Sequence, residues 1–129
     1  MLVETAIGSS LAQAVAARDD VLLRSWLSDG VRLRALIPAG LVEATGPDDV
    51  LALFESWFGG MHTVSLLDSA CDVIADRLLV SYRLALGKRD RRWLCGQEAF
   101  CELSEGRITS IDLVCSGFLE VSGERASNE

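Results

Sequence analysis

Several features that often identify a protein are missing from this sequence of 129 residues. It has one histidine, two prolines and no C-x-x-C pair among its four cysteines. No apolar run reaches the roughly 18 residues of a membrane-spanning helix, and the N-terminal segment lacks the basic region of a secretion signal. We therefore expect a cytoplasmic protein with no membrane contact, no metal, no cofactor and four buried, reduced thiols.

Positive charge is scarce as well. The 12 Lys+Arg against 19 Asp+Glu give a formal net charge of −7. This balance argues against nucleic acid as a partner, because affinity for phosphate backbones comes mostly from clustered lysine and arginine. Four basic residues do lie together, at Lys88, Arg89, Arg91 and Arg92. A solvated turn explains them, with anion binding as the alternative.

The hydrophobic content, 50% of the residues, is that of a folded domain. At this length a compact fold buries roughly two-thirds of the surface of the unfolded chain, which suffices for one core. We expect a single domain over residues 1–121 and a polar tail over 122–129.

The first half of the chain contains helical patterns. Strong helix formers fill residues 10–17, and Asp19 is placed to cap a second helix over 20–28. Gly46-Pro47 opens a third helix that ends at residue 58 and carries an apolar stripe. Between the second and third helices, residues 31–37 alternate apolar and basic side chains, which is the period of a strand.

The second half contains four long strand-like runs joined by short turns, at 62–74, 77–86, 92–103 and 107–118. Short connections predict antiparallel neighbours. Helices followed by such a meander predict an α+β fold in which a curved antiparallel sheet wraps the N-terminal helices. The last two strands are apolar on both faces, so we expect a second subunit to cover the face that the helices leave open.

This order of elements, with a helix ending in Trp57-Phe58, a turn of the sequence SEGRI and the closing run IDLVCSGF, resembles the nuclear transport factor 2-like superfamily over about residues 8–120. The resemblance implies a cone-shaped curved antiparallel sheet, a cystatin-like α+β barrel, around a deep pocket. It also implies a homodimer through the outer face of the sheet. The superfamily includes isomerases, cyclases, dehydratases, epoxide hydrolases and binding domains, so the fold does not name the chemistry.

Two branches of the superfamily lack their signature residues here. The ketosteroid isomerases place a catalytic aspartate before a proline, where this chain has Ile37, and a second aspartate where it has Ala99. The limonene-type epoxide hydrolases use an Arg-x-Asp pair on a strand. The single pair of that kind here, which begins at Arg18, lies at a helix boundary.

The polyketide cyclase branch, called SnoaL-like, matches better. The resemblance places Gln97 and Asp112 on its pocket-facing positions, with Asp112 as the acid/base and Gln97 orienting a carbonyl, although Ala99 replaces its histidine. Tyr82 shares a strand face with Val80 and Leu84 and is a candidate hydrogen-bond donor to the ligand. The alternatives are structural: a solvent-facing acid at 112, an amide bonded across the sheet at 97 and a core aromatic at 82.

The other candidate ligand contacts are Trp26, Trp57, His62, Ala99 and Val114. The two tryptophans lie on apolar helix stripes, as core or as a pocket wall. His62 opens the first long strand and is either solvated or catalytic.

Together these patterns predict a SnoaL-like protein with an internal hydrophobic pocket for a small apolar, polyketide-like or steroid-like molecule. Cofactor-free acid/base cyclisation, isomerisation or dehydration is the chemistry that would fit. The alternative is a non-catalytic dimeric binding protein or a protein-interaction module.

Overall fold

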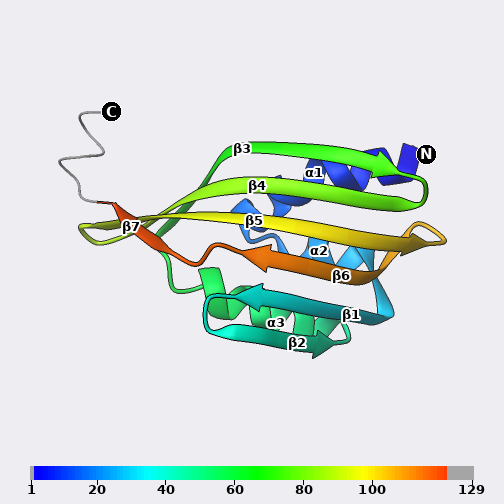
Figure 1. Cartoon of the computed structure of the whole chain (residues 1–129), viewed down its shortest axis with the longest axis horizontal. Helices are drawn as coiled ribbons and strands as arrows, with labels where there is room; N and C mark the ends of the chain where they lie inside the picture. Colours follow the sequence, from blue (N-terminus) through cyan, green and yellow to red (C-terminus); the bar gives the residue numbers. More distant parts are fainter. Residues whose placement is uncertain (1, 122–129) are drawn as a thin grey trace.

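The computed structural model describes residues 2–121, so the predicted polar tail lies outside the described residues. Within them, three helices lie behind one face of a curved seven-stranded sheet (Figure 1). The helices are α1 (Leu2–Ala17), α2 (Asp20–Trp26) and α3 (Pro47–Phe58). The strands are β1 (Leu27–Ile37), β2 (Gly40–Thr45), β3 (Thr63–Ile74), β4 (Arg77–Lys88), β5 (Arg91–Ser104), β6 (Arg107–Cys115) and β7 (Leu119–Val121).

The predicted α+β architecture is confirmed, with one difference in the sheet. The strand order is β2-β1-β6-β5-β4-β3, and β7 pairs with β5 beyond the end of β6. All neighbouring strands are antiparallel except β1 and β6, which run parallel. Both begin at the same end of the sheet, where Leu27 pairs with Ile108. The sheet is therefore mixed and open rather than a closed antiparallel barrel.

The local sequence explains where α2 and α3 begin. The Asp19 carboxylate accepts a hydrogen bond from the backbone N–H of Leu22 at 3.1 Å and caps α2, as predicted. Gly46, with φ of 87°, turns the chain into α3 at Pro47. Proline suits this position because the first helical N–H has no partner within the helix.

Four element boundaries differ from the sequence predictions. Helix α1 begins at Leu2 rather than at residue 10. Strand β1 begins at Leu27, so residues 28–30, predicted as a helix end and a turn, are part of a strand. The segment 40–45, left unassigned by its pattern, forms β2 because it pairs with β1 in a hairpin. Strand β6 ends at Cys115 because the chain turns away at Gly117, whose φ is 82°.

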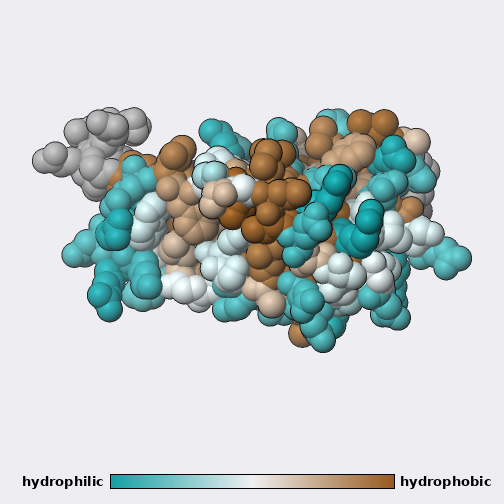
Figure 2. All heavy atoms as spheres, turned by 60° about the horizontal axis from the view of Figure 1, so that its bottom comes forward, coloured by the Kyte–Doolittle hydropathy of each residue, from teal (hydrophilic) through white to brown (hydrophobic). Residues whose placement is uncertain are grey.

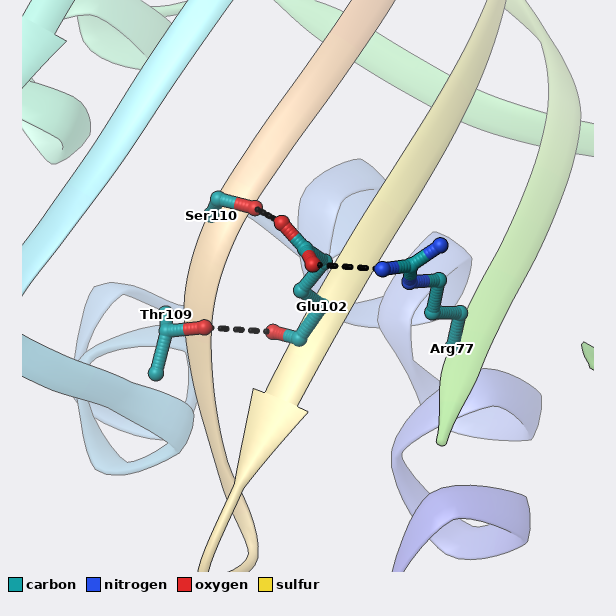
Figure 3. A network of polar contacts seen from close by, with 4 residues as sticks. All are labelled: Arg77, Glu102, Thr109 and Ser110. Carbon is teal, nitrogen blue, oxygen red and sulfur yellow. Dashed lines mark hydrogen bonds and ion pairs between the residues drawn. The ribbon is translucent and has the colours of Figure 1, made fainter. Parts of the chain in front are cut away.

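A bulge in β6 decides which side chains face the helices. Ser110 pairs with Glu102 and Ile108 with Leu103, which leaves Thr109 as an extra residue. The Thr109 hydroxyl donates to the Glu102 carbonyl at 3.2 Å, and Ser110 Oγ donates to the Glu102 carboxylate at 2.9 Å (Figure 3). Arg77 completes this network at 3.0 Å. Because of the bulge, Ile108 and Ile111 both face the helices, whereas strict alternation predicts opposite faces.

The core lies between this inner face and the helices. Alternate residues of the central strands, such as Leu33, Leu84 and Ile108, are fully buried against Ile7 of α1 and Phe58 of α3. Within the described residues no helix is long and apolar enough to cross a membrane.

Candidate ligand-binding site

A small cavity remains between the helices and the inner face of the sheet. Its volume is about 20 Å³, which is room for about one water molecule. Helices α1 and α3 contribute Leu11 and Phe54, among others, and the sheet contributes Tyr82, Ala99 and Ile111. Every lining residue except Tyr82 is apolar. The cavity walls are therefore apolar, and Tyr82 is the one lining residue that carries a polar group.

The Tyr82 hydroxyl belongs to a buried pair on neighbouring strands. Tyr82 of β4 and Gln97 of β5 lie directly opposite each other in the ladder, and each is 2% exposed. The Tyr82 hydroxyl donates to Gln97 Oε1 at 2.6 Å. Burial raises the pKa of Tyr82 far above its ordinary value of 10, so the phenol stays protonated and acts as a donor.

The Gln97 amide has hydrogen-bonding capacity to spare. Its Nε2 carries two N–H donors, and the one partner it has among the described residues is the weak acceptor Cys115 Sγ at 3.4 Å. Buried amide groups normally have all their strong donors paired. The second N–H of Gln97 is therefore available to an acceptor atom, but Gln97 meets the cavity only through its partner Tyr82, because it is not among the described residues that line it.

Two cysteines continue this polar cluster along the sheet. Cys95 Sγ of β5 lies 3.7 Å from Cys115 Sγ at the end of β6. Hydrogen bonds from Cys95, Gln97 and the backbone N–H of Gly117 lower the pKa of Cys115 although burial opposes this. The same contact with Cys115, together with burial, raises the pKa of Cys95. The sequence offered no C-x-x-C motif, and the strand register brings these two thiols together.

The structure places Asp112 away from the cavity. Its side chain is half exposed on the outer face of the sheet, where Arg34 Nε donates to Asp112 Oδ1 at 3.0 Å. Gln97 faces inward, so the sheet separates the two residues that the polyketide cyclase resemblance brings together. Val114 also lies on the outer face and is 54% exposed, whereas Ala99 lines the cavity.

The three remaining candidates occupy two different surroundings. Trp26 and Trp57 are half-buried and pack against the core, and neither is among the residues that line the cavity in the described part of the chain. The Trp57 ring meets the rings of Phe54 and Phe58 edge-on. His62 is exposed, and its Nδ1 accepts a hydrogen bond from the backbone N–H of Arg89 at 3.4 Å.

Phe54 occupies a position that the sequence pattern did not distinguish from ordinary core. Together with Val15 and Leu23 it lines both the cavity and a second hollow, whose rim includes Arg18 and Glu55. These three side chains therefore form the partition between the interior and the surface. The helical stripe of α3 identifies Phe54 as apolar and inward-facing, but the stripe cannot show that a cavity lies behind it.

The comparisons with known proteins concern the fold. No sequence profile of a protein family matches the chain, and no curated protein matches it. Among solved structures, an LEH-like epoxide hydrolase from M. tuberculosis superimposes with a TM-score of 0.69 at 15% identity, over 90% of this chain and 84% of that one. A protein from Xanthomonas campestris pv. campestris, provisionally named a polyketide cyclase, gives 0.69 at 13% identity, over 88% and 90%.

An NTF-2 like protein of unknown function from Burkholderia xenovorans LB400 covers 97% of this chain and 91% of its own, with a TM-score of 0.62 at 16% identity. The chain therefore has the nuclear transport factor 2-like α+β cone fold that the resemblance implied. Identities this low show the shared fold alone, and the chemistry must be argued from the site.

Proposed function

We propose that the protein binds a small apolar molecule that carries a hydrogen-bond acceptor, such as the carbonyl oxygen of a polyketide-like or steroid-like ketone. The observation behind this is the buried Tyr82–Gln97 pair, in which Tyr82 lines an otherwise apolar cavity and the Gln97 amide has an N–H without a strong partner. Ligand sites commonly combine apolar walls with a few such polar groups. The ligand would lie against Ala99 and Ile111 with its acceptor toward Gln97 Nε2.

A ligand of this class needs more room than the closed cavity offers. Pockets for such molecules measure about 300–1,000 Å³, against about 20 Å³ here. The partition formed by Val15, Leu23 and Phe54 is the place where the cavity could open, because the same side chains border the outer hollow. Rotation of the half-buried Phe54 ring would join the two spaces and admit the ligand between α1, α2 and α3.

Binding is proposed here rather than catalysis through Asp112. Acid/base chemistry requires the carboxylate within hydrogen-bond reach of the reacting atoms. Asp112 is bonded to Arg34 on the far side of the sheet, and no carboxylate is among the described residues that line the cavity. The geometry therefore favours the non-catalytic alternative that the sequence left open.

The test is a titration with apolar ketones of increasing size: acetophenone, 2-acetylnaphthalene and a steroid ketone. The variant Gln97→Met keeps the length of the side chain and removes its amide. We expect the variant to bind the best ketone about tenfold more weakly, since a neutral hydrogen bond contributes about 0.5–1.5 kcal/mol. Isothermal titration calorimetry gives the affinities, and circular dichroism confirms that the variant is folded.

A ligand without the acceptor is the matched control. We expect 2-ethylnaphthalene, which has the same rings but no carbonyl, to bind wild type and Gln97→Met equally well. If the wild type binds no ketone of the series, or if the variant weakens both naphthalenes alike, Gln97 does not anchor a carbonyl and the proposal fails.

We also propose that a second copy of the chain covers the outer face of the sheet. Leu41, Leu36 and Val114 form a row across β2, β1 and β6, because Leu36 pairs with both of the others in the ladder. Each is more than half exposed. Figure 2, which turns the β2 edge toward the viewer, shows brown side chains gathered between teal ones. We call Leu36, Leu41 and Val114 the outer apolar row.

Two ion pairs of the sheet lie near this row. Arg34 is bonded to Asp112 and Arg83 to Asp68, whereas the exposed Glu98, which pairs with Val114 in the ladder, has no ion pair among the described residues. The Arg83 guanidinium lowers the pKa of Asp68, which keeps that pair ionised. Cores of protein interfaces are apolar and poor in unpaired charge, so the outer apolar row and the two ion pairs suit contact with an identical face.

We expect wild-type protein to sediment as a dimer and Val114→Glu to raise the dimer dissociation constant at least about tenfold, because it buries a charge without a partner. Val21→Glu is the matched control, since Val21 is 82% exposed on α2, away from the outer apolar row. Analytical ultracentrifugation measures both. A monomeric wild type, or equal weakening by the two variants, would show that this face is not the interface.

A further inference from the structure

The cysteine pair next to Gln97 has features that the other two cysteines lack. Cys95 and Cys115 are 2% and 8% exposed and face the interior. The ladder pairs Gln97 with Cys115, which places Cys95 diagonally across from Cys115 on the same face. Their Sγ atoms are 3.7 Å apart, so shortening that distance to about 2.05 Å would give a disulfide bond.

The surroundings of the two sulfur atoms differ. Cys115 Sγ accepts hydrogen bonds from Gln97 Nε2 and from the backbone N–H of Gly117, each at 3.4 Å. Either thiol could donate in the contact between the two sulfur atoms, and the two N–H donors already aimed at Cys115 Sγ favour Cys95 as the donor. Hydrogen bonds of this kind favour the thiolate, which is the nucleophilic form of cysteine.

The other two cysteines serve as internal comparisons. Cys101 is buried, and burial raises its pKa to about 12. Cys71 is half-buried on β3, and burial raises its pKa too. Among the described residues neither sulfur accepts a hydrogen bond from an N–H group, so neither thiolate is stabilised in the way that Cys115 is.

The position of Cys115 also allows movement. It is the last residue of β6, and Gly117 turns the chain away two residues later. A side chain at a strand end can change its rotamer with less disturbance of the ladder than one in the middle. Closure of the gap between the two sulfur atoms therefore does not require the sheet to open.

We propose that Cys115 and Cys95 form an oxidation site for hydrogen peroxide, with Cys115 as the attacking thiol and Cys95 as the resolving thiol. The Cys115 thiolate attacks one peroxide oxygen, the O–O bond breaks, and Cys115 sulfenic acid and hydroxide result. The hydroxide takes the proton of Cys95. The Cys95 sulfur then attacks the Cys115 sulfur, and the S–O bond breaks with loss of hydroxide, which is protonated to water.

In total, two thiols lose two electrons to one peroxide molecule, and one disulfide and two water molecules are formed. The surroundings favour this oxidant over a larger one. Both sulfur atoms are buried among apolar side chains, so a small uncharged molecule reaches them more readily than charged glutathione disulfide does. The site does not depend on the ligand proposed above, because no ligand atom takes part.

The experiment treats folded wild-type protein with one equivalent of hydrogen peroxide and blocks the remaining thiols with N-ethylmaleimide at successive times. Digestion with trypsin and a glutamate-specific protease separates Cys95 from Cys101, because Glu98 lies between them. We expect the Cys95–Cys115 cross-linked peptide to accumulate first. Cys71 and Cys101 should stay reduced and therefore be found alkylated by the reagent. Mass spectrometry identifies each product.

Variants assign the two roles. In Cys95→Ser we expect dimedone to trap a sulfenic acid at Cys115, since the resolving thiol is gone. In Cys115→Ser we expect peroxide consumption to fall about tenfold, because the activated thiolate is lost. Cys101→Ser is the matched control and should form the cross-link at the wild-type rate.

Three results would overturn the proposal. One is that Cys71 or Cys101 of the wild-type protein is oxidised before Cys95 and Cys115. This result can be obtained without any variant. Another is a cross-link that forms only in urea. The third is equal reactivity with glutathione disulfide and with peroxide, which would contradict the assignment of a small neutral oxidant.

Discussion

Replacing Phe58 by alanine is expected to lower the free energy of unfolding by about 3–5 kcal/mol, the range found for large aromatic deletions in cores. Phe58 is 1% exposed at the end of α3, and its ring stacks on Phe118 at a centroid distance of 5.9 Å. Deleting it leaves a cavity where α3 and the chain before β7 meet. Urea titration followed by far-ultraviolet circular dichroism measures the loss.

The same substitution one helical turn earlier is the matched control. Phe54 lies on the same helix and is half-buried, so Phe54→Ala makes the same chemical change and removes less buried surface. We expect it to cost about 1–2 kcal/mol. If both variants lost the same free energy of unfolding, the difference in burial between Phe58 and Phe54 would not explain their stability effects.

The variant Gly8→Ala is expected to destabilise the protein although alanine is the better helix former by about 1 kcal/mol. Gly8 lies where α1 crosses β3, and a Cβ there would overlap Cys71 Sγ and lie 3.6 Å from Leu78 Cδ2. Forcing an extra methyl group into a packed contact costs about 1–3 kcal/mol. We therefore expect a net loss in the same urea titration.

A second substitution isolates the contact. Cys71→Ala removes the sulfur that the new Cβ would meet, so Gly8→Ala/Cys71→Ala should be more stable than the sum of the two single changes implies. The double-mutant cycle gives this coupling energy directly. Strict additivity would show that Cys71 is not the residue that excludes a side chain at position 8.

The sequence was sufficient to predict those parts of the fold that depend on local patterns. The Asp19 cap and the Gly46-Pro47 start of α3 rest on hydrogen bonding and backbone angles within a few residues. The inward direction of Tyr82 follows from alternation with Val80 and Leu84, all three of which are buried on one face of β4. Each of these conclusions requires only near neighbours along the chain.

The features that escaped prediction depend on contacts between distant segments. Alternation assigns a parity to each residue of β6, but the bulge at Thr109 changes that parity in mid-strand. Strand register, which the sequence does not supply, pairs Gln97 with Cys115 and Phe100 with Asp112. The direction of Asp112 and the proximity of the two thiols both follow from that register.

The parallel pairing of β1 with β6 has a consequence for chain entropy. It joins Arg34 to Asp112, 78 residues later in the sequence, whereas the β1–β2 hairpin and the β3–β6 meander close through short turns. The sheet thus consists of two locally connected parts that meet along one seam, with the segment 59–62 in the connection between them. Because the cost of closing a loop grows with the logarithm of its length, about 0.6 kcal/mol for each doubling, the seam tolerates a longer connection at little loss of stability.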